Sequence, residues 1–360
     1  MGDEGFVVVL GSGSLARATA NALATANGAP FEVRVVARDS AAIADICDIA
    51  AARAALAGSP AVFRPVPVPG FTESVLYDAF RELRPDGVFL CASRQSPWER
   101  STDPSPWTEF VQHAGYGVTV PLQAQFALAV GRAADRLGAR GRGGRAPWFV
   151  NACLPDIVNP LISALDVPVL CGIGNVAILA AFLQAATGAR DQTELRLLAH
   201  HYHLHAPHDP AEEALAWQGE TALPDVGTLL AAGRRVERRE LNQVTGLGAA
   251  TLITDLLTGT ERATHLPGPA GLPGGYPVLV RDGDVRLRLP PGLDREAAIA
   301  ANQRASVWDG AVLDGKHLSF SPAASAALRP LAQELADGFG VDRLDTACEQ
   351  LAELRARLRT

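Results

Sequence analysis

The chain has 360 residues, of which 48% are hydrophobic and 20% charged, a composition typical of globular proteins large enough for two domains. The formal net charge of −7 argues against a nucleic-acid partner, and no apolar run is long enough to span a bilayer. The five cysteines are odd in number and show no CxxC spacing, which argues against a disulfide framework or a zinc ribbon. Because no signal-peptide pattern is present, we expect a cytoplasmic protein whose partner is a small-molecule substrate.

The first part of the chain alternates between apolar strand-like runs and helical segments. Its β-branched apolar runs predict buried parallel strands at 6–10, 31–37, 61–68, 87–91 and 148–151. Helices are predicted between them at 18–26, 40–57, 73–83 and 120–137, with a loop at 92–107. This alternation predicts an α/β fold, in which residues 1–151 form a Rossmann-type domain with a doubly wound parallel sheet.

The second part of the chain, residues 152–360, has a different pattern and predicts an α+β substrate domain. Helices are predicted at 156–165, 176–188, 211–217, 225–233 and 239–258. Strands are predicted at 277–281 and 284–289 around Asp282-Gly283, and a second hairpin near 310–320 at Asp314-Gly315. A long amphipathic helix is predicted over 322–357.

The turn after the first predicted strand carries a dinucleotide-binding pattern. Gly11, Gly13 and Ala16 form G-x-G-x-x-A, directly after an apolar strand and before a helix. The first glycine allows a tight turn, the second lets the backbone approach a pyrophosphate, and the small third residue lets the helix pack on the sheet. The predicted cofactor-binding residues of the turn are Gly11, Ser12, Gly13, Ser14 and Leu15. The alternative is an ordinary glycine-rich turn between a strand and a helix.

The end of the second predicted strand favours NADP over NAD. NAD-binding chains usually carry an acidic residue there to bind the ribose hydroxyls, whereas this chain has Ala37 followed by Arg38. The absence of an acid removes repulsion toward a 2′-phosphate, and Arg38 can pair with that phosphate. The alternative is that Asp39 binds the ribose and Arg38 is a surface residue.

Several further segments follow in a familiar order: DICDIAAA at 45–52, CAS at 91–93, PWER at 97–100, FVN at 149–151 and GIGN at 172–175. With the histidine cluster at 200–205, this order resembles the lactate/malate dehydrogenase superfamily, which includes the NAD-dependent family 4 glycoside hydrolases. The resemblance implies a dinucleotide near Ala92 and Ser93, and a loop after the fourth strand that closes on substrate. It also implies a homodimer or a homotetramer.

The chain departs from this family where the family places its charged residues. In the dehydrogenases, an Asp that orients the histidine and an Arg that binds a carboxylate follow the glycine turn; the matching positions here are Ile178 and Ala181. The glycoside hydrolases would need a metal-binding Cys-His pair in the turn, where this chain has Gly174 and Asn175. Neither family mechanism transfers unchanged.

The segment HHYHLHAPH at 200–208 is the strongest candidate for acid–base chemistry, because a histidine exchanges protons near neutral pH. If the segment is a strand, His201, His203 and His205 lie on one face. His201 matches the family histidine best, with His203 next. No metal is expected, but these three imidazoles are the set that would hold one. The alternative is that several are packing or surface residues.

The other candidate residues are polar side chains at positions that border a ligand in this fold. Asn151, at the end of a buried strand, is predicted to orient the substrate, although a turn-forming role is the alternative. Arg94 and Arg100 suit an anionic substrate group, or are solvated. Asn175 is a substrate-binding candidate or a helix cap, and Asn242 lies on a helix that would border the pocket.

We therefore expect an NADP(H)-dependent oxidoreductase that moves a hydride to or from a carbonyl, alcohol or imine carbon of a polar small metabolite. One alternative is a hydrolase, epimerase or lyase that reduces its dinucleotide only transiently. The other is a non-catalytic dinucleotide sensor, which the missing Asp and Arg favour.

Overall fold

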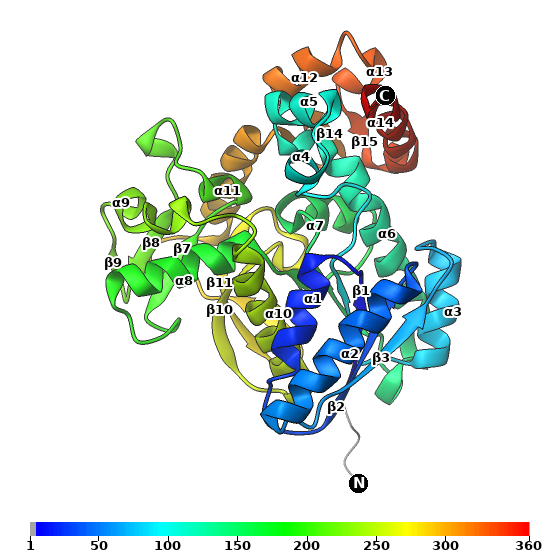
Figure 1. The fold of residues 1–360 in the computed structure, drawn as a ribbon. Helices are drawn as coiled ribbons and strands as arrows, with labels where there is room; N and C mark the ends of the chain where they lie inside the picture. Colours follow the sequence, from blue (N-terminus) through cyan, green and yellow to red (C-terminus); the bar gives the residue numbers. More distant parts are fainter. Residues whose placement is uncertain (1–4, 360) are drawn as a thin grey trace.

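The fold is built on one parallel sheet. The computed structural model describes residues 5–359, and its largest sheet has six strands in the order β3-β2-β1-β4-β5-β6 (Figure 1). The strands are β1 (Gly5–Leu10), β2 (Phe31–Ala37), β3 (Val62–Pro67), β4 (Gly87–Leu90), β5 (Trp148–Asn151) and β6 (Cys171–Gly172). Leu10 lies opposite both Val36 and Leu90, so the carboxyl ends of these strands meet at one edge. This order confirms the predicted Rossmann-type sheet.

Helices cover both faces of this sheet and make up much of the rest of the molecule (Figure 1). Those between the first strands are α1 (Ser14–Leu23), α2 (Ser40–Ala57), α3 (Glu73–Leu83), α4 (Glu99–Thr102), α5 (Pro106–Ala114) and α6 (Val120–Leu137). Those that follow are α7 (Pro155–Ser163), α8 (Asn175–Thr187), α9 (Val226–Leu230), α10 (Leu241–Thr258), α11 (Arg295–Asp309), α12 (Pro322–Leu328), α13 (Gln333–Ala336) and α14 (Leu344–Arg359).

Three small antiparallel sheets lie outside the parallel sheet. Their strands are β7 (Leu195–Leu198), β8 (Leu215–Gln218) and β9 (Thr221–Ala222); β10 (Arg262–Pro267), β11 (Gly275–Arg281) and β12 (Asp284–Leu287); and β13 (Ala311–Asp314), β14 (His317–Phe320) and β15 (Phe339–Gly340). The 3-10 turns are η1 (Tyr116–Thr119), η2 (Gly138–Arg140), η3 (Arg142–Gly144), η4 (His201–Leu204), η5 (Pro210–Glu212), η6 (Gly233–Arg235), η7 (Pro269–Gly271) and η8 (Val341–Arg343).

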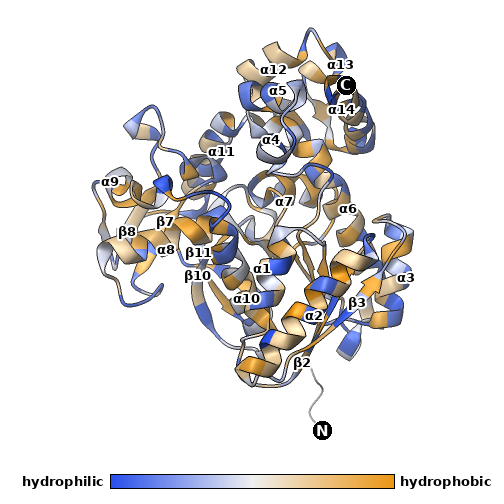
Figure 2. Cartoon of the chain, viewed as in Figure 1, coloured by the Kyte–Doolittle hydropathy of each residue, from blue (hydrophilic) through white to orange (hydrophobic). Residues whose placement is uncertain are grey.

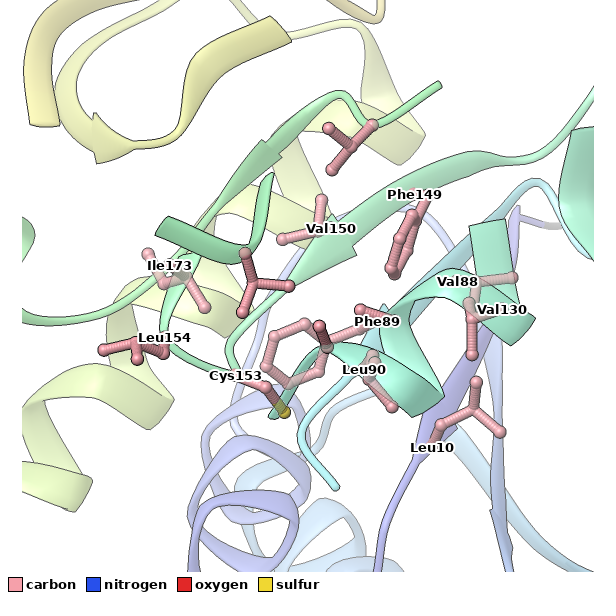
Figure 3. Packing of buried hydrophobic residues seen from close by; sticks show 14 of the residues in the cluster. Leu10, Val88, Phe89, Leu90, Val130, Phe149, Val150, Cys153, Leu154 and Ile173 are labelled. Atoms are coloured by element: carbon pink, nitrogen blue, oxygen red, sulfur yellow. The ribbon is translucent and has the colours of Figure 1, made fainter. Parts of the chain in front are cut away.

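The main core lies on the central strands. Side chains of β1, β4 and β5 pack against one another and against Val130 of α6 (Figure 3). A second, smaller core joins α8, α9 and β7, and the apolar character of α8 stands out in Figure 2. Strand β6 lies beyond residue 151, so both sides of the predicted domain boundary contribute to one sheet. Within residues 5–359, no helix combines the length and the apolar character that crossing a membrane requires.

Helix α10 lies directly against α1, the helix that follows the glycine turn (Figure 1). Gly246 makes this approach possible, because a Cβ on it would lie 2.7 Å from the Cβ of Ala18. The start of α10 is thereby held beside the start of α1, where Asn242 Nδ2 donates to Ser14 Oγ at 2.8 Å.

Three predicted elements are wrong in type. Residues predicted as a helix at 211–217 instead end η5 and begin β8, whose backbone pairs with β7. The long helix predicted over 322–357 is divided into α12, α13, β15 and α14, because Pro330 and the glycines at 338 and 340 interrupt it. The loop predicted at 92–107 contains α4 and the start of α5.

The sequence pattern also missed β10, the rest of α5 and the whole of α11. Helix α11 is rich in alanine and polar residues and lacks the broad apolar face that marks most helices. Its boundaries did carry signals, since Asp294 caps its start through the N–H of Ala297 and Gly310 ends it with φ 106°. The two predicted hairpins are confirmed; Asp282 and Gly283 have φ of 52° and 76°, as a type I′ turn requires.

Candidate active site

The glycine turn has the geometry of a phosphate cradle. Gly11 has φ 142°, its N–H donates to Val36 O at 3.0 Å, and a Cβ on it would lie 3.0 Å from Cys91 Sγ. Gly13 precedes α1 without any side-chain cap, and a Cβ on it would meet nothing within 4 Å. Ser14 is exposed. The first amides of α1 therefore face open space, which is where a helix binds an anion.

These residues fit the pyrophosphate of a dinucleotide. The turn provides unpaired helix N-terminal amides, room beside Gly13 and no acidic residue in the first turn of α1. Gly11, Ser12, Gly13, Ser14 and Leu15 are the residues that would hold the group, as the sequence predicts.

At the end of β2, the two charged residues have different surroundings. Asp39 is the N-cap of α2, and its carboxylate accepts the N–H of Ala42 at 3.0 Å. Arg38 is exposed, and within the described residues it forms no ion pair. If Asp39 bound the ribose, as in the alternative, the ribose hydroxyls would compete with the Ala42 N–H for its carboxylate.

Two cysteines lie where β4 and β5 end, at the carboxyl edge of the sheet. Cys91 Sγ donates to Leu10 O at 3.3 Å, and Cys153 Sγ donates to Ala92 O at 3.1 Å. Figure 3 shows Cys153 beside the side chains of β4. Burial holds the pKa of both thiols above the ordinary value, so they remain protonated. Ser93, next along the chain, donates to Gln95 O at 2.6 Å.

Asn151 organises the turn after β5. Its Oδ1 accepts the N–H of Cys153 at 2.9 Å, and its Nδ2 donates to Cys153 O at 3.2 Å and to Asn159 Oδ1 at 2.9 Å. The side chain is fully buried, with both amide hydrogens committed. Asn151 therefore holds Cys153 in place, as in the turn-forming alternative, and its contact with substrate stays a prediction.

The histidine segment is a 3-10 turn, η4, and not the predicted strand. The backbone N–H of His200 donates to His203 Nδ1 at 2.8 Å, and the N–H of Tyr202 reaches His200 Nδ1 at 3.3 Å. These ring-to-backbone bonds satisfy the chain locally and compete with an extended conformation. As a result, the imidazoles diverge instead of sharing one face.

His201 forms a buried pair with Asp309. Its Nδ1 lies 2.9 Å from both carboxylate oxygens of Asp309, the last residue of α11. The His201 backbone N–H donates to Asp156 Oδ1 at 2.9 Å, and its ring stacks on Tyr116 with centroids 5.9 Å apart. The His201 side chain is 24% exposed and Asp309 is buried. With Nδ1–H donated to the carboxylate, Nε2 is the nitrogen that can exchange a proton.

The electrostatics of the pair favour a protonated imidazole. Burial alone would lower the pKa of His201, but the Asp309 carboxylate and its hydrogen bond outweigh burial and raise that pKa. Burial alone would raise the pKa of Asp309, but the charge of His201 and its hydrogen bond lower it. For Asp156, burial outweighs the charge of His201 and the backbone hydrogen bond, and raises its pKa to about 7. Burial also lowers the pKa of His200 to about 3, and this ring stays neutral.

Asp309 is fixed by close backbone packing against η1. A Cβ on Gly117 would lie 2.7 Å from Asp309 O and from Ala311 N, so only glycine allows this approach. The same packing brings Tyr116 onto His201, while Gln123 Nε2 donates to the Tyr116 hydroxyl at 2.8 Å. Burial raises the pKa of Tyr116 above its ordinary value, so it remains a neutral phenol.

His200 Nδ1 also lies 3.7 Å from Asp309 Oδ2, whereas His203 and His205 have other partners. His203 is buried, with Nδ1 accepting the His200 N–H and Nε2 bonded to Glu212 O at 2.9 Å, and burial lowers its pKa. Both ring nitrogens of His203 are thus engaged by the backbone, and its catalytic role stays a prediction. His205 is exposed. In the part of the chain that the structure describes, no group of histidine, cysteine or acidic residues is arranged to hold a metal, and the set that would have held one, His201, His203 and His205, is not brought together.

The candidate substrate-binding residues are dispersed. Arg94 donates to Gln125 Oε1 at 3.0 Å and to Cys348 Sγ at 3.4 Å, whereas Arg100 is exposed on α4. Asn175 is the first residue of α8 and makes no capping bond, so its alternative role as a cap is wrong. Asn242 lies at the glycine turn, where it donates to Ser14. No sequence pattern pointed to Asp309, Asp156 or Tyr116, which come from three separate segments.

Taken together, the sheet order and the glycine turn define a Rossmann-type fold. No family model matches the chain, and no curated protein matches it. Solved structures do: lactate dehydrogenase from Cryptosporidium parvum aligns at 11% identity and a TM-score of 0.50, over 86% of this chain and 99% of that one. Malate dehydrogenase from Salinibacter ruber aligns at 11% identity and a TM-score of 0.50, over 98% and 99%. The predicted resemblance is confirmed for the fold.

Proposed function

We propose that this chain is an NADP(H)-dependent oxidoreductase that acts on a carbonyl, alcohol or imine carbon of a polar small metabolite. The observation that carries the proposal is the His201–Asp309 pair, whose neighbour Tyr116 lies near Cys153 at the carboxyl edge of the sheet. Ligands bind at this edge in doubly wound sheets. The nicotinamide, when bound, supplies or accepts the hydride.

The protein's own residues have two functions, cofactor binding and proton transfer. The amides of Gly11–Leu15 hold the pyrophosphate, and Asn242 supports that turn through Ser14. His201 gives or takes a proton at Nε2, and Asp309 orients the ring and stabilises the imidazolium. Asp156 positions the His201 backbone. In the dehydrogenases, an Asp at the position of Ile178 orients the histidine. Ile178 is buried and apolar and cannot do this, so Asp309 takes that role here.

Arg38 is expected to set the preference for NADPH over NADH. Its exposed guanidinium has no acidic partner among the described residues and can pair with a 2′-phosphate. We expect wild-type protein to bind NADPH at least tenfold more tightly than NADH, about 1.4 kcal/mol. Arg38→Ala should lose this preference without weakening NADH binding, as measured by calorimetry. Arg64→Ala, which removes another exposed arginine from the edge strand β3, is the control; an unchanged preference in Arg38→Ala would contradict the assignment.

His201→Asn is expected to abolish turnover and to keep cofactor binding. Loss of a general acid–base group costs about 10²- to 10⁴-fold in rate. The measurement is NADPH oxidation with panels of 2-oxo acids, aldehydes, ketones and imines, with His205→Asn as the control because His205 is exposed on the same segment. If wild-type protein binds NADPH but oxidises it with none of these substrates, the oxidoreductase proposal is wrong. The two alternatives, transient use of the dinucleotide and a sensor, which the apolar Ile178 and Ala181 favour, would then replace it.

A further inference from the structure

A cavity of about 160 Å³ lies between α7, α11 and the β13–β14 hairpin. Its walls are mostly apolar, from Ile157, Pro160 and Val312, and its polar groups are Asp156, Ser306 and Gln303. His201 does not line it. An engineered cavity of about 150 Å³ accommodates benzene, so this one has room for about six heavy atoms.

The cavity wall has a buried acid but no cation of its own. Asp156 is 2% exposed, and among residues 5–359 no arginine, lysine or histidine lines the cavity. The titratable groups that face Asp156 are His201 from η4, Asp309 from α11 and Tyr276 from β11. The His201 ring pairs with Asp309 and not with Asp156. Asp156 receives only a hydrogen bond from the His201 backbone N–H and the weaker attraction of a charge that Asp309 already pairs. A buried carboxylate normally requires a paired positive charge.

We propose that this cavity binds a small organic cation, a primary ammonium group on a short apolar chain of up to about six heavy atoms. The ammonium group pairs with the Asp156 carboxylate and replaces the cation that the wall lacks. The chain packs on Ile157, Pro160 and Val312. The Gln303 side chain is exposed at the mouth and offers an amide oxygen to a second ammonium hydrogen.

Such a ligand acts on the histidine pair through Asp156. A bound cation holds Asp156 in its charged form and also adds its own positive charge, and the Asp156 carboxylate is one of the groups that set the pKa of His201. Occupancy of the site therefore changes the charge beside the histidine pair. It goes beyond the proposed oxidoreductase activity, because binding of the cation requires neither dinucleotide nor substrate.

The test is calorimetric titration of the full chain with n-butylammonium chloride, and with 1-butanol and sodium butyrate as neutral and anionic probes of similar size. We expect butylammonium alone to saturate the protein. Because burial raises the pKa of Asp156 to about 7, affinity should fall about tenfold between about pH 8.5 and about pH 6. If butanol binds as tightly as butylammonium, the cavity is an ordinary apolar void and the proposal is wrong.

Two variants locate the binding. Asp156→Asn keeps the shape and removes the charge, and we expect at least a tenfold loss of butylammonium affinity. Val312→Phe fills the cavity without changing Asp156 and should abolish butylammonium binding. This variant tests whether the cation binds in the cavity even if Asp156→Asn does not fold. Val307→Phe, at an exposed position of α11, is the control and should bind as wild type does. Unchanged binding in Val312→Phe would place the cation elsewhere and overturn the proposal.

Discussion

Asp309→Asn is expected to lower kcat by about 10²- to 10⁴-fold and to leave NADPH affinity unchanged. The amide cannot neutralise an imidazolium, and it can hold His201 in the wrong tautomer by donating to Nδ1. Asp314→Asn, an exposed carboxylate five residues along the chain, is the matched control and should keep full activity. Equal kcat in the two variants would show that the pair has no part in proton transfer.

The pH dependence of Asp309→Asn gives a second readout. Asp309 raises the pKa of His201, so its loss leaves burial to lower that pKa, and the pH–rate profile should shift to lower pH.

The pair also affects stability. The raised pKa of His201 stabilises the fold below about pH 6.5, and the lowered pKa of Asp309 stabilises it above about pH 4. The Tm of wild-type protein should therefore exceed that of the variant most between about pH 4 and about pH 6.5, as measured by thermal unfolding at a series of pH values.

Glu99→Gln is expected to lower the free energy of unfolding by about 2–4 kcal/mol. Glu99 is 5% exposed and accepts hydrogen bonds from Arg355 Nη2 at 2.9 Å, from Arg359, and from Gln95 Nε2 at 2.8 Å. Breaking a fully buried ion pair costs about 3–5 kcal/mol, and the partial exposure of both arginines reduces that cost. Urea denaturation at neutral pH measures the difference.

The control for Glu99 is Asp103→Asn. Asp103 also pairs with Arg359, but its side chain is 58% exposed, so its loss should cost no more than about 1 kcal/mol. Equal losses in the two variants would mean that burial does not strengthen the Glu99 pairs. These pairs tie the segment predicted as a substrate-closing loop, 92–107, to α14. Any closure of that segment must therefore break or carry along its contacts with the C-terminal helix.

The sequence was informative where the determinants of structure are local. The run FVVVL, the glycine turn and the β-branched residues of β2 each lie within a short stretch of sequence, so they predicted the parallel sheet correctly. Asp282-Gly283 similarly predicted its hairpin, because a type I′ turn depends on two residues.

The sequence was uninformative where a site joins distant segments. His201 and Asp309 are 108 residues apart, and their pairing depends on how α11 ends against η1. Alternation in HHYHLH predicted a strand, but the hydrogen bond from the His200 N–H to the His203 ring stabilises a turn instead. Asn151 was correctly identified as the end of a buried strand, yet its neighbours in space, Cys153 and Asn159, satisfy its amide.

The most direct test of the dinucleotide-dependent account is calorimetric titration of NADPH into wild-type protein and Gly13→Asp. Gly13 has extended φ and ψ of −79° and −173°, and a Cβ there meets nothing within 4 Å, so the variant should fold. Asp is also a favourable N-cap and should stabilise α1. Its carboxylate would occupy the anion position and repel the pyrophosphate. We predict saturable NADPH binding by wild type and at least tenfold weaker binding by a variant of equal or higher Tm. Equal NADPH affinity in the two proteins, or no binding by wild type, would contradict the account.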